Sequence, residues 1–155
     1  MRSIHSYLEE YAASHRHPLN KKIHWVCVPL IFFTIIGFLY CIPLPLNITT
    51  NIQLNAAHLA LLFITIYYFL LSPSLSVGML LFLLVCLAGC YLFQSFAPVP
   101  LWALCAFIFV VAWIFQFYGH NVEGARPSFL KDLQFLMIGP AWLMSFIYAR
   151  MGIRL

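Results

Sequence analysis

The feature that most constrains this chain is a long stretch, residues 23–122, that contains no Asp, Glu, Lys or Arg. Lys22 and Glu123 flank it. A charge at the centre of a bilayer costs on the order of 3 kcal/mol, so membrane-spanning segments exclude charged side chains. A soluble domain would carry charges in the loops between its helices, whereas this chain is 8% charged and 64% hydrophobic overall. The sequence therefore predicts an integral membrane protein.

Prolines and polar residues divide the apolar stretch into four runs. Each run approaches the ~20 residues that cross a bilayer as a helix, so we expect transmembrane helices at residues 21–41, 56–71, 75–93 and 101–118. A further apolar segment, residues 129–149, carries two charges and a central Gly139-Pro140. It is left open as a re-entrant, an interfacial or a fifth spanning helix. The expected fold is all-α, a polytopic membrane helical bundle that forms one membrane domain over residues 1–155.

The segment before the first span, residues 2–15, has the pattern of an amphipathic helix. Its apolar and aromatic positions recur at helical spacing and fall on one stripe: Ile4, Tyr7, Leu8, Tyr11 and His15. Such a helix can lie on the bilayer surface with its stripe inward, so an interfacial helix is expected. Pro18 is expected to end this segment, and Asn20 to cap the first span.

The basic residues predict the orientation of the protein. All eight Lys and Arg residues lie outside the apolar stretch, towards the two ends of the chain. Four spans bring both ends to one side, and the positive-inside rule makes that side cytoplasmic. We expect a multi-pass protein of the endoplasmic reticulum in a eukaryote, or of the inner membrane in a bacterium. Because topology accounts for the few basic residues, no nucleic-acid partner is indicated; homo-oligomerisation is left open.

Polar residues gather in two short segments, residues 15–24 and 116–127. They are far apart in sequence, but the expected topology brings both to the cytoplasmic face. The first segment contributes His15 and His24. In the second, Gln116, His120 and Glu123 follow one another at the i+4 and i+3 spacings that place side chains on one helical face.

Imidazole is the commonest protein ligand of metal ions near neutral pH. Three histidines, or two histidines and a carboxylate, leave positions open on Fe(II) for oxygen and substrate. We therefore predict His15, His24, His120 and Glu123 as the catalytic metal ligands. Glu123 could instead orient a ligating imidazole from outside the ligand shell.

The remaining histidines are expected to play no part in such a site. His17 lies in the turn and is expected to face solvent, and His5 lies off the inward stripe. His58 begins the second span, about 30 Å from the others under the four-span topology, and is expected to be structural.

Two ordered motifs resemble those of the fungal 2-hydroxy fatty acid dioxygenase family, which acts in the breakdown of phytosphingosine to odd-numbered fatty acids. The motifs are Tyr11-x3-His15-x4-Asn20-x3-His24-x4-Pro29 and Gln116-x2-Gly119-His120-x2-Glu123-x2-Arg126-Pro127. They bracket the four apolar runs as they do in the family. The chain departs from the usual pattern at Cys27, where the family has glycine, a change expected to affect packing near His24.

The resemblance implies an Fe(II)-dependent enzyme that uses molecular oxygen to shorten a 2-hydroxy fatty acid by one carbon. The family's histidines correspond to His15, His24 and His120. Independently, a site at headgroup depth suits an amphiphile whose tail stays in the bundle or among the membrane lipids. The basic residues beside it are candidate anchors for the substrate carboxylate: Arg126, Lys21 and Lys22, with Arg126 favoured for its fork geometry. Asn20 and Gln116 are the candidate uncharged contacts of the substrate.

Two other classes of function fit the histidine pattern. A haem-binding membrane protein needs only two facing histidines, for which His24 and His120 could serve. A small transporter, or another membrane protein without enzymatic activity, could carry the same interfacial histidine cluster. The first predicts a haem absorption band, and the second predicts no stoichiometric metal.

Overall fold

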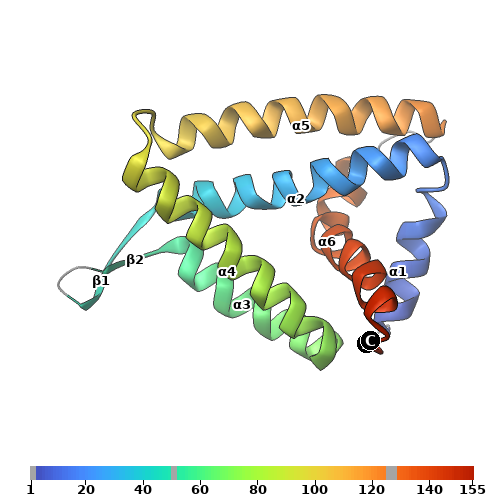
Figure 1. The fold of residues 1–155 in the computed structure, drawn as a ribbon, viewed down its shortest axis with the longest axis horizontal. Helices are drawn as coiled ribbons and strands as arrows, with labels where there is room; N and C mark the ends of the chain where they lie inside the picture. The colour runs from blue at the N-terminus through green and yellow to red at the C-terminus, as the bar shows by residue number, and fades with distance from the viewer. Residues whose placement is uncertain (1–2, 50–51, 125–128) are drawn as a thin grey trace.

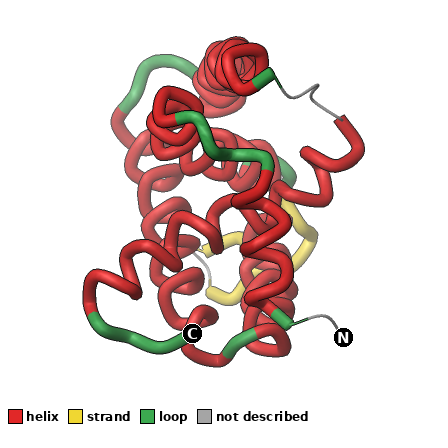
Figure 2. The backbone as a smooth tube through the Cα atoms, turned by 90° about the vertical axis from the view of Figure 1, so that its right-hand side faces the viewer, coloured by secondary structure: helices red, strands yellow, loops and turns green. Residues whose placement is uncertain are grey.

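The computed structural model describes residues 3–49, 52–124 and 129–155. Its elements in chain order are α1 (Ile4–Ala13), α2 (Pro18–Tyr40), β1 (Pro43–Thr49), β2 (Ile52–Asn55), α3 (Ala56–Leu71), α4 (Pro73–Phe96), α5 (Leu101–Glu123) and α6 (Phe129–Met151) (Figure 1). The expected helical class is confirmed. β1 and β2 pair antiparallel, so residues 43–55, between the first two expected spans, contain a small hairpin that the sequence pattern did not predict. It is the one departure from helix among the described elements (Figure 2).

Helix α2 is the central element of the bundle, and it packs against α3, α4, α5 and α6. It lies side by side with α5, and the two run antiparallel, so the start of α2 meets the end of α5 (Figure 1). Helices α3 and α4 form a second antiparallel pair, and α1 packs on α6 next to the start of α2. This arrangement brings the two polar segments of the sequence to one end of the molecule.

Three of the helices, α2, α4 and α5, are long and apolar enough to cross a membrane, with 23, 24 and 23 residues. Helix α3 has the bounds expected for the second span, but its 16 residues extend only about 24 Å, less than the ~30 Å hydrocarbon core. The count of four spans therefore stays a prediction. The α6 segment from Phe135 to Met151 is likewise apolar but shorter.

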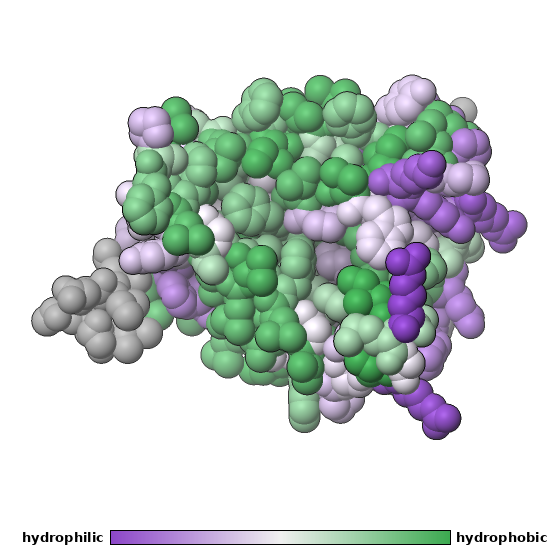
Figure 3. Space-filling model, viewed as in Figure 1, coloured by the Kyte–Doolittle hydropathy of each residue, from purple (hydrophilic) through white to green (hydrophobic). Residues whose placement is uncertain are grey.

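The outer surface of the bundle fits an integral membrane protein. Large apolar side chains on three helices are mostly exposed, among them Phe63 at 65%, Val85 at 69% and Phe107 at 69%. Such a surface would be unfavourable in water and is favourable against lipid tails. Hydropathy colouring shows apolar residues over most of the visible face, with hydrophilic residues gathered at the end where α2 begins and α5 ends (Figure 3).

The start of α2 differs from the sequence expectation. The helix begins at Pro18, and His17 caps it by accepting a hydrogen bond from the Leu19 N–H at its Nδ1 atom, 3.2 Å away. Proline is well suited to the first helical position, where its missing N–H would have no partner in the helix. The expectation that Asn20 caps the helix was wrong, because Asn20 lies in the first turn and its side chain contacts α5 instead.

The apolar stripe of α1 is buried against protein. Ile4, Leu8 and Tyr11 join a core cluster with Ile138 and Trp142 of α6. The sequence predicted that this stripe would face the bilayer, but in the structure it faces α6. Packing on α6 fixes the direction of α1, and with it the position of His15 just beyond the helix end.

Candidate metal centre

Three buried imidazoles meet where the start of α2, the end of α5 and the α1–α2 turn come together. His15 lies in the turn, His24 in α2 and His120 in α5, and their side chains are 3%, 2% and 7% exposed. Each offers a ring nitrogen, and these nitrogens all lie within 4.8 Å of one another. The structure thus brings together the three histidines predicted from the sequence, over more than one hundred residues of separation.

Backbone carbonyl groups fix the tautomer of two of these rings. His15 donates from Nδ1 to the Tyr11 carbonyl at 2.7 Å, and His24 donates from Nδ1 to the Asn20 carbonyl at 2.9 Å. A carbonyl oxygen can only accept, so each Nδ1 must carry the hydrogen. In the neutral rings, both Nε2 atoms then present lone pairs.

The two lone pairs point at each other across 2.9 Å between the Nε2 atoms of His15 and His24. Without a positive charge between them this contact is repulsive. A metal ion satisfies both atoms, and a backbone acceptor on the distal nitrogen is the usual partner of a metal-ligating histidine. With metal–nitrogen bonds of about 2.1 Å, the 2.9 Å separation matches neighbouring positions around an octahedral ion. The donor set therefore fits a divalent transition metal.

Burial favours the ligand form of His15. It lowers the pKa of His15 below its ordinary value of 6.5, mainly because the charged ring loses its hydration. The hydrogen bond to the Tyr11 carbonyl raises the pKa in part, and the nearby His120 lowers it further. Tyr11 also stacks on His15, with ring centroids 4.1 Å apart and planes inclined by 10°. The imidazole is thus held neutral and in one orientation, as metal binding requires.

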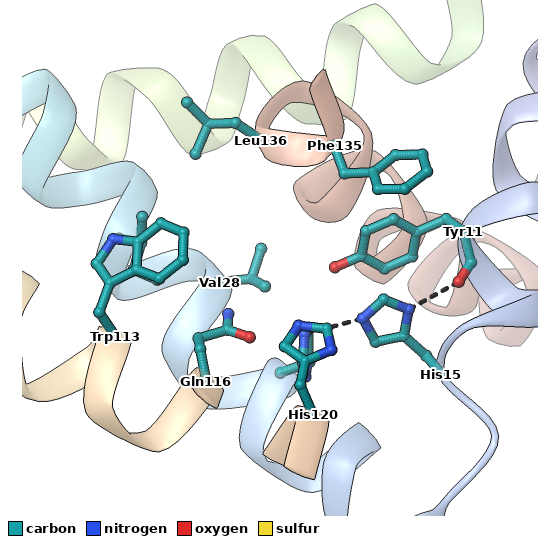
Figure 4. Close-up of a pocket in the computed structure, with 10 residues that line it drawn as sticks. Tyr11, His15, Val28, Trp113, Gln116, His120, Phe135 and Leu136 are labelled. Atoms are coloured by element: carbon teal, nitrogen blue, oxygen red, sulfur yellow. Dashed lines mark hydrogen bonds between the residues drawn. The ribbon is translucent and has the colours of Figure 1, made fainter. Parts of the chain in front are cut away.

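A small pocket opens onto the three imidazoles. Its remaining wall is mostly apolar and is formed by Tyr11, Val28, Ile31, Trp113, Gln116, Phe135 and Leu136 (Figure 4). The histidines and Gln116 lie at one side, while Trp113 and Leu136 lie farther from the histidines. This division of the pocket wall suits an amphiphilic ligand, with its polar head at the histidines and its apolar tail towards Trp113 and Leu136.

Gln116 is buried, with 5% exposure, and lines this pocket one turn before His120. Its Oε1 atom has no hydrogen-bond partner among the described residues. A buried acceptor without a partner costs about 1–3 kcal/mol, so an amide oxygen in this position is suited to a donor on a ligand. The structure therefore keeps Gln116 as a candidate substrate contact.

Glu123 lies in a different place from the one expected for a metal ligand. Its carboxylate accepts hydrogen bonds from the backbone N–H groups of Arg16 and His17 and from the Asn20 side chain. Among the described residues, the group whose atoms lie close enough to hold one metal ion consists of the three histidines and does not include Glu123. With its oxygens committed to the α1–α2 turn, the carboxylate neither reaches the metal position nor contacts an imidazole directly.

Three further residues predicted as substrate contacts lie at the start of α2, and none of them lines the pocket. Asn20 is fully buried and bonds to Glu123 and His24, so it belongs to the framework of the site and does not line the pocket. Lys22 is exposed and Lys21 half-buried, and neither lines the pocket. Lys21 nevertheless lies close enough for its charge to act on His15.

The two histidines expected to lie apart from the site, His17 and His58, are not in the pocket wall. His17 is exposed at its helix-capping position. His58 contacts Asn55 and faces Tyr40 at the opposite end of α2, as expected for a structural residue. Arg126 lies outside the described residues. Cys27, the departure from the family pattern, is buried beside Ile31 and Ala112 of the α2–α5 interface, so the larger side chain is accommodated there.

Sequence reasoning missed the apolar wall of the pocket. A signal for it exists, because Trp113, Gln116 and His120 follow one another at helical spacing, as do His24, Val28 and Ile31. On each helix, the residues that line the pocket therefore lie on the same face as the histidine. In a chain where nearly every position is apolar, this pattern does not stand out.

Comparison with known proteins agrees with the motifs and the geometry. Residues 1–151 match the family described as 2-hydroxy-palmitic acid dioxygenase Mpo1-like. The chain is also 30% identical over 151 residues to the 2-hydroxy-palmitic acid dioxygenase MPO1 of Saccharomyces cerevisiae, covering 96% of this chain and 82% of the yeast protein. No solved structure matches the chain. The match over nearly the whole length, together with the two histidine motifs, shows that the chain belongs to the Mpo1-like family.

Proposed function

We propose that this protein is an Fe(II)-dependent dioxygenase that shortens 2-hydroxy fatty acids by one carbon at one face of a membrane. The observation that carries the proposal is the meeting of three buried imidazoles at the wall of a largely apolar pocket. The name of the yeast relative supports the choice of a 2-hydroxy acid as substrate. The apolar surface of the bundle supports a substrate delivered from the membrane.

His15, His24 and His120 would hold the iron through their ring nitrogens. Fe(II) with three protein ligands keeps coordination positions open and supplies the centre at which molecular oxygen can react with an organic acid. The carbonyl groups of Tyr11 and Asn20 keep the first two rings in the ligand tautomer. Burial of the three rings excludes bulk water from the reacting groups.

The pocket would orient the substrate by its two unlike ends. The 2-hydroxyl and carboxylate lie next to the imidazoles, and the first carbons of the acyl chain lie against the apolar side chains. Gln116 accepts a hydrogen bond from the 2-hydroxyl at its Oε1 atom, which has no partner among the described residues. Lys21 contributes positive charge near the carboxylate, and Arg126 is the further anchor expected from the sequence.

The overall conversion balances without an added reductant. A 2-hydroxy acid R–CH(OH)–COOH and O2 give R–COOH, CO2 and H2O. The bond between the carboxyl carbon and the hydroxyl-bearing carbon breaks, and that second carbon becomes the new carboxyl group. The substrate gives up four electrons and oxygen takes up four. The products are therefore a fatty acid one carbon shorter and carbon dioxide.

A haem carrier fits the geometry less well. The ring centroids of the three histidines are 4.2, 5.1 and 5.5 Å apart, so each ring packs against the other two. No pair of these rings brackets a slot wide enough for a porphyrin. The absence of a Soret band from the purified protein would agree with this.

The test is a comparison of the parent protein with His24→Ala and His120→Ala, each loaded with Fe(II) under anaerobic conditions. His58→Ala is the matched control, because it removes a histidine at the opposite end of α2. We expect one iron per chain, and oxygen-dependent conversion of 2-hydroxypalmitic acid to the acid one carbon shorter, in the parent and the control. Iron content and turnover that persist in both site variants would refute the proposal.

A further inference from the structure

The carboxylate of Glu123 accepts hydrogen bonds from three donor groups in the α1–α2 turn and the first turn of α2. Its Oε1 atom accepts from the backbone N–H of Arg16 at 2.8 Å, and its Oε2 atom accepts from the N–H of His17 at 2.8 Å. Oε2 also accepts from Nδ2 of Asn20 at 3.1 Å. Both oxygens are thus used to hold the turn between α1 and α2.

The position of Glu123 is unfavourable for its own helix. It is the last residue of α5, next to Gly124, whose positive φ of 72° ends the helix. A helix C-terminus carries partial negative charge, which disfavours a carboxylate. The same carboxylate lies at the N-terminus of α2, where partial positive charge and open N–H groups favour an anion. The interactions of the carboxylate with the turn and with the start of α2 are therefore favourable, whereas its interaction with the end of α5 is unfavourable.

The contacts of Glu123 connect it, through neighbouring residues, to all three imidazoles of the centre. Glu123 lies one turn after His120 on α5. Arg16 and His17 directly follow His15, so their bonds to Glu123 fix the backbone that carries this ring. Asn20, whose side chain bonds to Glu123, orients His24 through its carbonyl oxygen.

We propose that Glu123 is a positioning residue that assembles the metal centre, because it ties the His15 turn and Asn20 to the helix of His120. The proposal rests on the proposed function for the identity of the bound ion. Loss of the carboxylate leaves all three imidazoles in the chain but frees the turn. Iron affinity is expected to fall 10- to 100-fold, the usual effect of removing a partner outside the ligand shell.

The first test needs no metal. Arg16 is exposed, and the N–H of the peptide bond that follows it is bonded to Glu123. We therefore expect trypsin to cut this peptide bond only when the turn leaves Glu123. In detergent and without metal, Glu123→Ala is expected to be cut after Arg16 on the order of tenfold faster than the parent, because cleavage follows the population of the opened turn. Glu9→Ala is the matched control, since Glu9 is an exposed acid on α1. Cleavage of Glu123→Ala at the parent rate would overturn the proposal.

The second test separates positioning from direct ligation. Fe(II) affinity is measured for the parent, Glu123→Ala, His15→Ala and the double variant. Because Glu123 positions His15 as well as Asn20, its removal is expected to weaken binding 10- to 100-fold in the parent and by a smaller factor when His15 is already absent. Glu123→Gln keeps one acceptor oxygen and is expected to lie between the parent and Glu123→Ala. An equal loss in both backgrounds would show that Glu123 acts independently of His15, against the proposal.

The two tests also keep this proposal distinct from the proposed function. A parent protein that binds no iron would refute the proposed function, while the trypsin result would still decide whether Glu123 fixes the His15 turn. A parent that binds iron and turns over substrate, with Glu123→Ala unchanged in both tests, would refute the positioning role alone.

Discussion

Replacement of Gly119 by alanine tests how closely α2 and α5 must approach beside the metal centre. A Cβ atom at this position would lie 2.5 Å from Oδ1 of Asn20 and 3.3 Å from Cδ1 of Ile23. Oδ1 must therefore move by about 0.9 Å to reach the 3.4 Å of an ordinary contact. Asn20 is not free to move, because its amide bonds to Glu123 and its carbonyl to His24.

The expected cost of Gly119→Ala follows from opposing terms. Overpacking of a buried contact costs about 1–3 kcal/mol. Alanine recovers up to about 1 kcal/mol over glycine within a helix. The unfolding free energy is therefore expected to fall by about 1 kcal/mol. The displaced Asn20 disturbs the bonds that hold Glu123 and His24, so iron affinity is expected to fall by a further factor of ten or more.

The assay pairs thermal unfolding in detergent with Fe(II) titration. Gly37→Ala is the matched control, because its Cβ would lie 2.3 Å from Sγ of Cys105 in the same α2–α5 interface but at the other end of α2. We expect both variants to be destabilised, and only Gly119→Ala to lose iron affinity. Equal iron affinity in Gly119→Ala and the parent would refute the link from helix contact to ligand geometry.

Three further predictions concern pH, substrate choice and stability. Because burial lowers the pKa of His15, the unfolded chain binds more protons than the metal-free folded protein below about pH 6.5. The unfolding free energy should therefore fall as the pH drops through that range, and a His15→Gln variant with the same slope would contradict this. Gln116→Leu should reduce the preference for binding 2-hydroxypalmitic over palmitic acid by about tenfold or more, measured by competition; an unchanged preference would exclude Gln116 as the hydroxyl contact. Tyr68→Phe should lower the unfolding free energy by about 1–3 kcal/mol without changing iron affinity, because the buried Tyr68 hydroxyl donates to the Met137 carbonyl of α6.

The sequence was most informative where a physical constraint acts on every residue of a segment. Exclusion of charge from residues 23–122 predicted apolar helices, and α3 begins and ends at the expected residues. Motif spacing, read with the expected topology, placed His15, His24 and His120 at one end of the bundle, where the structure has them. Their role as iron ligands stays a prediction until metal is measured.

The sequence was least informative where partners are main-chain groups. Glu123 was expected near the metal because carboxylates often bind metals, but its partners are mostly backbone N–H groups, which leave no trace in the residue pattern. The hairpin at residues 43–55 was missed because its prolines favoured a loop and its strands are short. The start of α2 was misplaced because Pro18 was interpreted as a break between helices, although proline also suits a first helical position.

X-ray absorption at the iron edge, on purified protein loaded with one equivalent of Fe(II), tests most directly whether His15, His24 and His120 share one ion. The parent should show only nitrogen and oxygen neighbours, with the outer-shell scattering of several imidazoles, and His24→Ala should lose part of that scattering. A parent spectrum without imidazole scattering, or one that is identical in His24→Ala, would contradict the account.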